Sequence, residues 1–468
     1  MRHAIRLLQS EIGKPRVFVL CFSLALSCCT QQPALAQDAN SSFVEQDSPM
    51  KERFAEVDKA LFLEMVKLAK FNIHFHLEAN HHQKWRTLTY PAARESGTAL
   101  TFSATLIELN QQSKGLDNLK RISRTELKKA VTCGITGNAI SGTASALELA
   151  QNTWVMMKAR EHGYSPKRSL EFVKNIIANT DRLLETRERL ATEVVSSERR
   201  QVVDLETKMV RTIRQQLLFE FGTWSCHSRD QAWRENTFYT LDSLQNYTRM
   251  SAGIMAMKAF GNPQIARYAV ITALTANSVA TLNPIIRNLA GIAIRKHQER
   301  KLKTIFPFER PELPSNELDA LQERLSTEEH QRQHPVDHQA WLRKVAALNQ
   351  RSEKVDVVLN RETKDIERYR QVAQQQSVSG PLIGLTGVAG ATLATVAVYG
   401  YPRDFETVNK LGFAGRITQG TGQAYALINT PYTIARGLIR NRDLRRRGEL
   451  PTQLLQERLD RLNKFSGE

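Results

Sequence analysis

The chain alternates two kinds of helix-forming stretch and carries almost no signal for strands. Apolar residues recur at spacings of three and four from Ser48 onward, whereas alternating runs are few and hairpin dipeptides such as Asn-Gly are absent. The first spacing is typical of amphipathic helices, and short hairpins depend on such dipeptides. We therefore expect an all-α fold in which long amphipathic helices pack as bundles or coiled coils and alternate with Gly/Ala-rich hydrophobic helical segments.

The first 36 residues have the layout of a secretory signal peptide. Basic residues precede an apolar run from Val17 to Cys29, and Ala34-Leu35-Ala36 forms a small-x-small site. The run is about 13 residues long, whereas about 20 are needed to cross a bilayer. We predict export with cleavage after Ala36. An uncleaved anchor, or lipid attachment at Cys28 or Cys29, is the alternative.

The charge of the chain bears on its partners. The formal net charge is +17, and only a small part of it lies in the leader. In the cytoplasm such a charge would suggest nucleic acid, but export favours an anionic lipid surface or an acidic envelope polymer. We therefore expect a membrane or anionic envelope partner, with periplasmic or membrane-associated localisation, and no nucleic acid. A secreted protein is the alternative.

Cleavage of the leader would leave two cysteines, Cys133 and Cys226. An oxidising compartment permits a disulfide between them, and two free thiols are the alternative. No Cys-x-x-C motif occurs, so a thioredoxin-like redox site and a structural zinc site have no support.

Proline and its neighbours mark the boundaries of several segments. Ser48-Pro49, Ser165-Pro166 and Asn262-Pro263 each place a capping side chain before a proline, which suits a helix start. From Pro166 an apolar stripe predicts one long helix to about Leu218. The expected organisation is a signal peptide 1–36, an N-terminal helical region 37–164, a region 165–305 with the long amphipathic helix and an apolar helix, a Pro-rich linker 306–315, heptad-patterned helices 316–376, and an apolar segment with a basic tail 377–468.

The clearest heptad row lies between Trp341 and Tyr369, where positions four and three residues apart are mostly apolar. One helix of an intramolecular bundle needs this stripe, and so does an intermolecular coiled coil. The row therefore makes residues 341–369 a candidate surface for a homo-oligomer.

The segment Val378 to Tyr401 is the strongest candidate for a membrane span. No charge occurs between Arg370 and Arg403, and about 20 apolar residues suffice to cross a bilayer. Gly384, Gly387 and Ala391 are candidate membrane-contact residues at helical spacing, where small side chains also let helices approach closely. A buried helix of a soluble bundle is the alternative.

Other segments give weaker membrane signals. Tyr268 to Ile286 is uncharged, but its asparagines would be costly in lipid. Ser96 to Leu100 and Gly134 to Ala150 are flanked or interrupted by Glu95 and Glu148, and we expect close-packed soluble helices there. In the basic tail, Arg445, Arg446 and Arg447 are candidates for contact with anionic headgroups, with a solvated helix face as the alternative.

One histidine cluster offers possible metal ligands. His74, Glu78 and His82 share a helix face at spacings of four, so neighbouring pairs could bind a divalent metal, although a further ligand would have to come from elsewhere. Hydrogen-bonded or exposed histidines are the alternative. No G-x-S-x-G, H-E-x-x-H or Walker A motif occurs. No catalytic residue or organic cofactor is expected.

The sequence thus predicts an exported, non-enzymatic helical envelope protein that associates with a membrane through one or more Gly/Ala-rich apolar segments. Its expected role is structural or interactive. The alternatives are a soluble periplasmic or secreted helical binding module and, more remotely, a metal-dependent enzyme.

Overall fold

The computed structural model describes residues 48–79, 86–194, 197–260, 262–308, 384–448 and 451–466. All regular structure in these ranges is helical, which confirms the all-α prediction. The chain divides into two units, 1–51 and 52–468, and the account below concerns the second. The predicted signal peptide, the heptad row 341–369 and all but the first residues of the Pro-rich linker lie outside the described residues.

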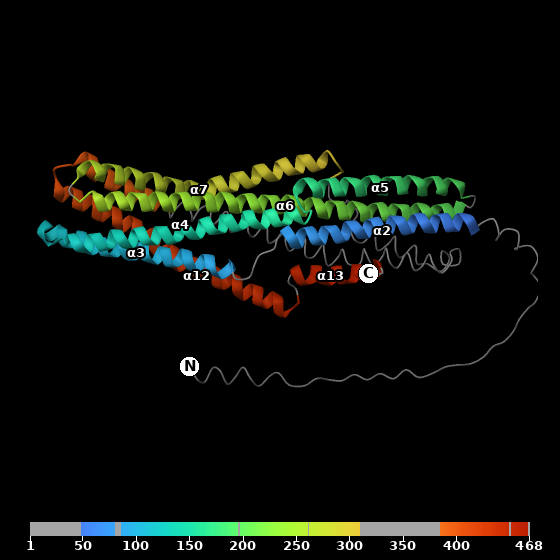
Figure 1. Cartoon of the computed structure of the whole chain (residues 1–468), viewed down its shortest axis with the longest axis horizontal. Coiled ribbons are helices and arrows are strands. Elements are labelled where there is room, and N and C mark those ends of the chain that lie inside the picture. The colour runs from blue at the N-terminus through green and yellow to red at the C-terminus, as the bar shows by residue number, and fades with distance from the viewer. Residues whose placement is uncertain are drawn as a thin grey trace, which may run out of the picture. The chain divides into compact units, whose positions relative to one another are not determined.

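Figure 1 shows the described helices along the chain. In chain order they are α2 (Ser48–Ala79), α3 (Arg86–Asp117), the 3-10 turn η1 (Leu119–Arg121), α4 (Arg124–Glu161), α5 (Pro166–Glu193), α6 (Ser197–Lys258), α7 (Pro263–Lys303), a helix at Gly384–Gly400 that we call helix 384–400, α12 (Phe405–Arg446) and α13 (Pro451–Ser466).

The predicted starts of α5 and α7 are confirmed by their caps. The Ser165 side chain accepts from the backbone N–H of Arg168 at 3.3 Å, and Asn262 Oδ1 accepts from the N–H of Gln264 at 3.0 Å. Each capped helix continues with proline, whose missing N–H costs nothing at this position. Between α4 and α5 the chain turns at Gly163, whose φ of 90° suits glycine.

The prediction of one helix from Pro166 to Leu218 is wrong. The helix ends at Glu193, Val194 is extended, and α6 packs back against α5. Arg187 of α5 donates to the carbonyl oxygen of Val203 at 2.9 Å and meets Glu206 at 2.6 Å. The apolar stripe runs through both α5 and α6. Such a stripe is the same for one long helix and for two helices that pack against each other, so it did not reveal the turn.

We call α2, α5, the first part of α6 through Cys226, the end of α7 and α13 the core bundle. Its interior contains large apolar side chains. The Phe71 ring lies 4.3 Å from Phe172 and 6.1 Å from Phe221, centroid to centroid. Its surface carries charges, as the exposed faces of α5 do. This distribution is ordinary for a protein in water.

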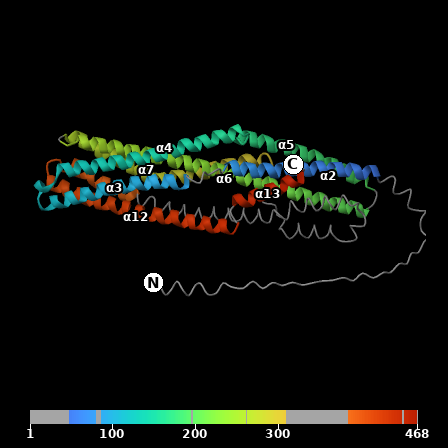
Figure 2. The same ribbon diagram turned by 60° about the horizontal axis from the view of Figure 1, so that its bottom comes forward.

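We call α3, α4, α6 from Arg229 onward, α7, helix 384–400 and α12 the cavity bundle. It consists of three helical hairpins whose turns lie near residues 118–123, 259–262 and 401–404. Three contacts bring the turns to one end. Arg124 donates to the carbonyl oxygen of Phe260 at 3.0 Å, Arg267 lies over the Tyr399 ring at 5.3 Å, and Asn409 donates to the carbonyl oxygen of Gln112 at 2.9 Å. Both views place the helices of this bundle alongside one another (Figures 1 and 2).

Glycine allows two of these helix pairs to meet backbone to backbone. A Cβ atom built on Gly137 of α4 would lie 2.5 Å from the carbonyl oxygen of Gly97 in α3. A Cβ on Gly390 would lie 2.5 Å from the carbonyl oxygen of Gly415 in α12. No side chain fits at these crossings, so the small-residue segments are the places where helices pack most closely.

Candidate functional site

A cavity of about 770 Å³ runs through the cavity bundle and is lined by all six of its helices. Along α3 the lining extends from Arg94 to Gln112, which is about 27 Å at 1.5 Å per residue. Most of its functional groups are charged or amide side chains. They include Arg94, Glu95, Glu108, Asp242, Gln245, Arg249, Asn277, Asn283, Arg287, Arg416 and Gln423.

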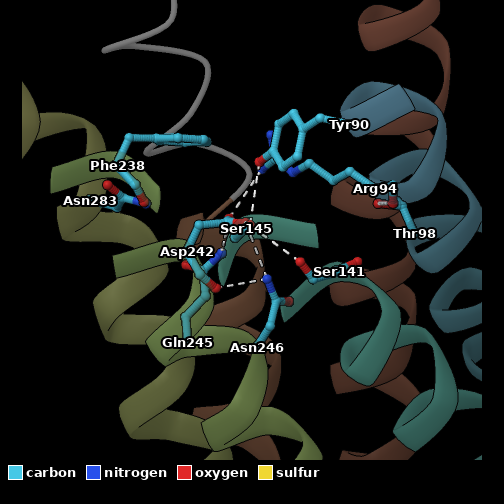
Figure 3. Close-up of polar contacts among 10 residues, drawn as sticks. All are labelled: Tyr90, Arg94, Thr98, Ser141, Ser145, Phe238, Asp242, Gln245, Asn246 and Asn283. Atoms are coloured by element: carbon cyan, nitrogen blue, oxygen red, sulfur yellow. Dashed lines mark hydrogen bonds and ion pairs between the residues drawn. The ribbon is translucent and has the colours of Figure 1, made fainter. Parts of the chain in front are cut away.

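Asp242 of α6 is the centre of a buried polar network (Figure 3). Its side chain is completely buried and accepts from Ser145 Oγ at 2.5 Å, Gln245 Nε2 at 2.7 Å and Asn246 Nδ2 at 3.3 Å. Arg94 Nη2 of α3 lies 3.4 Å from the same carboxylate. The network joins α3, α4 and α6 and thereby fixes the position of Arg94 at the cavity wall.

A second ion pair closes the wall between α3 and α12. Arg416 of α12 contacts the Glu108 carboxylate of α3, and Thr105 Oγ1 donates to Gln423 Oε1 at 2.8 Å one turn away. These contacts join segments that are about 300 residues apart in the sequence. Arg416 is therefore neutralised by a carboxylate, as Arg94 is.

Two further arginines line the cavity without a carboxylate partner. Arg249 donates through Nε and Nη2 to the amide oxygen of Asn277, at 3.1 and 2.7 Å. Arg287 lies over the Phe238 ring at 5.4 Å, and Arg94 lies 5.3 Å from the centroid of the same ring. Within the described part of the chain, neither Arg249 nor Arg287 forms an ion pair.

The outer surface of the cavity bundle has the opposite character. Between Lys129 and Lys158 of α4, from 229 to 257 of α6, and from 268 to 293 of α7, no described exposed residue is charged. Of the large apolar side chains that the described residues expose, all but Leu63 and Phe172 belong to this bundle or its turns. Apart from Leu302 at the end of α7, which belongs to the core bundle, its described buried hydrophobic residues are all alanines. The bundle is thus polar inside and apolar outside.

The apolar helices only partly match the predicted spans. Among the described residues, α7 alone is long and apolar enough to cross a membrane, and it contains the segment Tyr268 to Ile286. Residues 378–383 of the favoured segment lie outside the described residues, and helix 384–400 is shorter. This helix turns Gly384 and Gly387 toward α7, where built Cβ atoms would lie 2.7 Å from Thr281 Cα and 3.0 Å from Asn277 Oδ1.

Gly384, Gly387 and Ala391 therefore lie on the inner face of helix 384–400, and the three are buried. Its outer face carries Leu385, Val396 and Tyr399 instead. The small residues serve helix packing, as their spacing also predicted. The basic residues Arg445, Arg446 and Arg447 are exposed at the end of α12.

The histidine cluster stays a prediction. His74 is exposed on α2, Glu78 Oε2 lies 3.6 Å from His162 Nδ1 of α4, and His82 lies outside the described residues. No three potential metal ligands of the described residues come together.

Cys133 and Cys226 are free thiols, so the disulfide that the sequence allowed is not formed. Ile135 of α4, which is two residues from Cys133, packs against Gly253 of α6. Cys226 lies about 40 Å from Gly253 along α6 at 1.5 Å per residue, whereas a disulfide requires α-carbons within about 7 Å.

The arginines and Asp242 of the cavity were not recognised in the sequence. The signal was present in α6, where Asp242 and Arg249 are separated by two turns and the exposed positions between them are Leu244 and Tyr247. A helix with charges on one side and apolar residues on the other has the same sequence pattern whether its charged side lies in water or lines a cavity. No family model matches the chain, and no curated protein or solved structure matches it.

Proposed function

We propose that this is an exported, non-enzymatic helical envelope protein whose cavity bundle lies in the hydrocarbon layer of a membrane. The core bundle lies in water on one side of that layer. The cavity would hold a polar solute within the membrane or give it a path across. The observation that carries this proposal is the reversed polarity of the cavity bundle, with charges and amides inside and uncharged, largely apolar residues outside.

The reversal argues for lipid because water would give the opposite arrangement. A bundle in water buries its large apolar side chains and exposes its charges, as the core bundle does. The cavity bundle exposes Leu147, Leu282, Ile285 and Ile428 while burying Asp242. Large apolar side chains exposed on several neighbouring helices mark a contact with a membrane or another protein. Because the apolar surface extends over several helices, we infer that lipid covers it.

The lengths of the uncharged outer faces agree with a bilayer. From Lys129 to Lys158 of α4, and from Arg267 to Arg295 of α7, the helix extends roughly 40 Å, and a bilayer is about 40–45 Å thick including its headgroup regions. The one charge inside each interval is directed inward: Glu148 is buried and Arg287 lines the cavity.

Several hydroxyl groups on the outer face have partners within their own helix. Ser96 and Ser103 donate to the carbonyl oxygens of Ala92 and Ala99, both at 2.8 Å, and Thr275 donates to Ile271 at 3.0 Å. A hydroxyl bonded in this way needs no water. Exposed aromatic residues lie near both ends of the bundle, such as Trp154 and Tyr399, where aromatic belts meet the headgroups.

Average hydropathy understates this arrangement. The middle stretches of α3, α6 and α12 carry cavity-lining charges such as Arg94, Asp242 and Arg416. A hydropathy window averages these with the apolar outer face, and of the described helices α7 alone passes the test for a span. The segments Ser96 to Leu100 and Gly134 to Ala150, which we expected in soluble helices, belong to α3 and α4 and are part of the proposed membrane bundle.

Extraction of membranes tests the proposal. The wild-type chain should remain in the pellet after high salt and after alkaline carbonate, and should be released by detergent, because salt removes only electrostatic attachment. Protein that leaves the membrane without detergent would contradict the proposal.

A pair of variants sharpens this test. Leu282→Arg places a charge on the outer face, which costs about 2.5 to 3.5 kcal/mol near the bilayer centre, and should lower the yield of membrane-bound protein. Glu185→Arg, on the exposed face of α5 in the core bundle, is the matched control and should leave the yield unchanged. Equal yields would place Leu282 in water.

A further inference from the structure

We infer that the cavity is a binding site for small oxyanions, such as carboxylates or phosphates, which it holds at Arg249 and Arg287. The inference goes beyond the proposed membrane location. It rests on the charges that line the cavity and not on what surrounds the bundle.

The cavity lining contains more arginines than carboxylates. Four arginines and three carboxylates line the cavity. The pairs Arg94–Asp242 and Arg416–Glu108 account for two of each. The remaining groups are Arg249, Arg287 and Glu95. Asp242 also attracts Arg249, and Glu95 also attracts Arg94, but four guanidinium groups against three carboxylates still leave one positive charge in excess.

Arg249 offers the better-defined of the two positions. Its described hydrogen bonds go to a neutral group, the Asn277 amide oxygen, through Nε and Nη2 at 3.1 and 2.7 Å. Asn277 is itself confined by Gly387 of helix 384–400. The contact orients the guanidinium without neutralising it, and Nη1 has no described partner. A charge in such surroundings is costly until a counter-ion arrives, and guanidinium groups suit planar or tetrahedral oxyanions.

Arg287 forms a second position further along the cavity. Its guanidinium lies over the Phe238 ring, so the ring supports the side chain without cancelling its charge. The Nε atom of Arg287 is buried and has no hydrogen-bond partner among the described residues, so a donor is left for an anion. On α7, Asn277 and Arg287 are about 15 Å apart at 1.5 Å per residue.

Because Arg249 contacts α7 at Asn277, about 15 Å along the helix from the backbone of Arg287, we infer a separate anion position at each arginine. The cavity therefore has two anion positions in series. Arg94 lies between them, because it pairs with Asp242 and also faces the Phe238 ring. This row of guanidinium groups favours anions over cations along the length of the cavity.

Equilibrium dialysis of the detergent-solubilised full chain against radiolabelled inorganic phosphate, at constant ionic strength, tests the inference. The wild type should bind phosphate saturably. Arg249→Gln and Arg287→Gln should each weaken binding by about tenfold or more, because each removes a charge-assisted interaction. Arg249→Lys keeps the charge and should retain part of the affinity.

The matched control is Arg295→Gln, which removes a half-exposed arginine of the same helix that pairs with Glu299 outside the cavity lining. Its phosphate affinity should equal that of the wild type, and circular dichroism and gel filtration should show every variant folded. If Arg249→Gln does not fold, Arg249→Lys should still bind phosphate more weakly than Arg295→Lys, because a lysine cannot reproduce the forked contacts of a guanidinium.

Two results overturn the inference: absence of saturable phosphate binding by the folded wild type, or an equal loss of affinity in Arg249→Gln and Arg295→Gln. Both leave the membrane proposal standing, because extraction tests it separately. Phosphate binding by a chain that needs no detergent would support the anion site and contradict the membrane proposal.

Discussion

Arg187 forms a buried ion-pair network in the core bundle. It is completely buried, with Nε 2.8 Å from Asp58 and Nη2 2.6 Å from Glu206. Burial alone would lower the pKa of its guanidinium, but the two carboxylates outweigh that effect and the pKa is raised. Arg187→Gln should lower the free energy of unfolding by about 3 to 5 kcal/mol, since it leaves two carboxylates buried without a counter-charge.

Chemical denaturation of the purified chain measures this loss. The control is Arg211→Gln, which breaks an exposed pair with Glu188 and should change the free energy of unfolding by less than about 1 kcal/mol. Equal effects of the two substitutions would mean that the Arg187 network is exposed to water in solution.

Cys226 gives a prediction about pH. Burial raises the pKa of its thiol from 9.0 to about 12, so the folded chain keeps the proton at pH values where the unfolded chain loses it. The stability from this difference is complete below pH 9 and is lost as the pH rises toward 12. Cys226→Ala should flatten this alkaline part of the stability profile. Iodoacetamide at pH 8 should leave Cys226 unmodified until the chain unfolds, and rapid alkylation of folded protein would contradict its burial.

At the scale of the elements, close helix crossings depend on glycine. Gly390→Ala would push a methyl group to 2.5 Å from the Gly415 carbonyl oxygen, and a backbone cannot move aside as a side chain can. We expect a loss of about 1 to 3 kcal/mol. Gly134 lies within α4 with its nearest neighbour, Ala104 Cβ, at 3.7 Å from a built Cβ, so Gly134→Ala should gain about 0.5 to 1 kcal/mol. Thermal melting in detergent compares the two, and shifts of the same sign would contradict the crossing.

Sequence patterns predicted elements better than their arrangement. The caps at Ser165 and Asn262 set helix starts because capping is local chemistry. The turn at Val194 was missed because the apolar stripe continues on both sides of it. The polar cavity was missed because its wall combines residues such as Arg94, Asp242 and Arg416 from three helices far apart in the chain. No local pattern states which face of each helix points inward.

At the scale of the whole cavity bundle, the three hairpin turns come together at one end, so they should lie on one side of the membrane. Lys120→Cys and Arg403→Cys place thiols at two exposed turn positions, and Lys167→Cys places one at the exposed start of α5. A membrane-impermeant maleimide should label the two turn positions from one side and position 167 from the other. Labelling of all three from the same side would exclude this topology.

The central claim is that the outside of the cavity bundle faces hydrocarbon. Spin labels on Leu289→Cys and Ile428→Cys, which replace side chains that are 61% and 74% exposed, measure that surface in reconstituted vesicles, with Glu185→Cys on α5 as the reference in water. Oxygen enters the hydrocarbon layer, whereas a water-soluble nickel complex stays outside it. The spin labels at positions 289 and 428 should therefore collide more often with oxygen than with the nickel complex, and the label at position 185 should show the reverse. Dominant collisions with the nickel complex at all three positions would contradict the account.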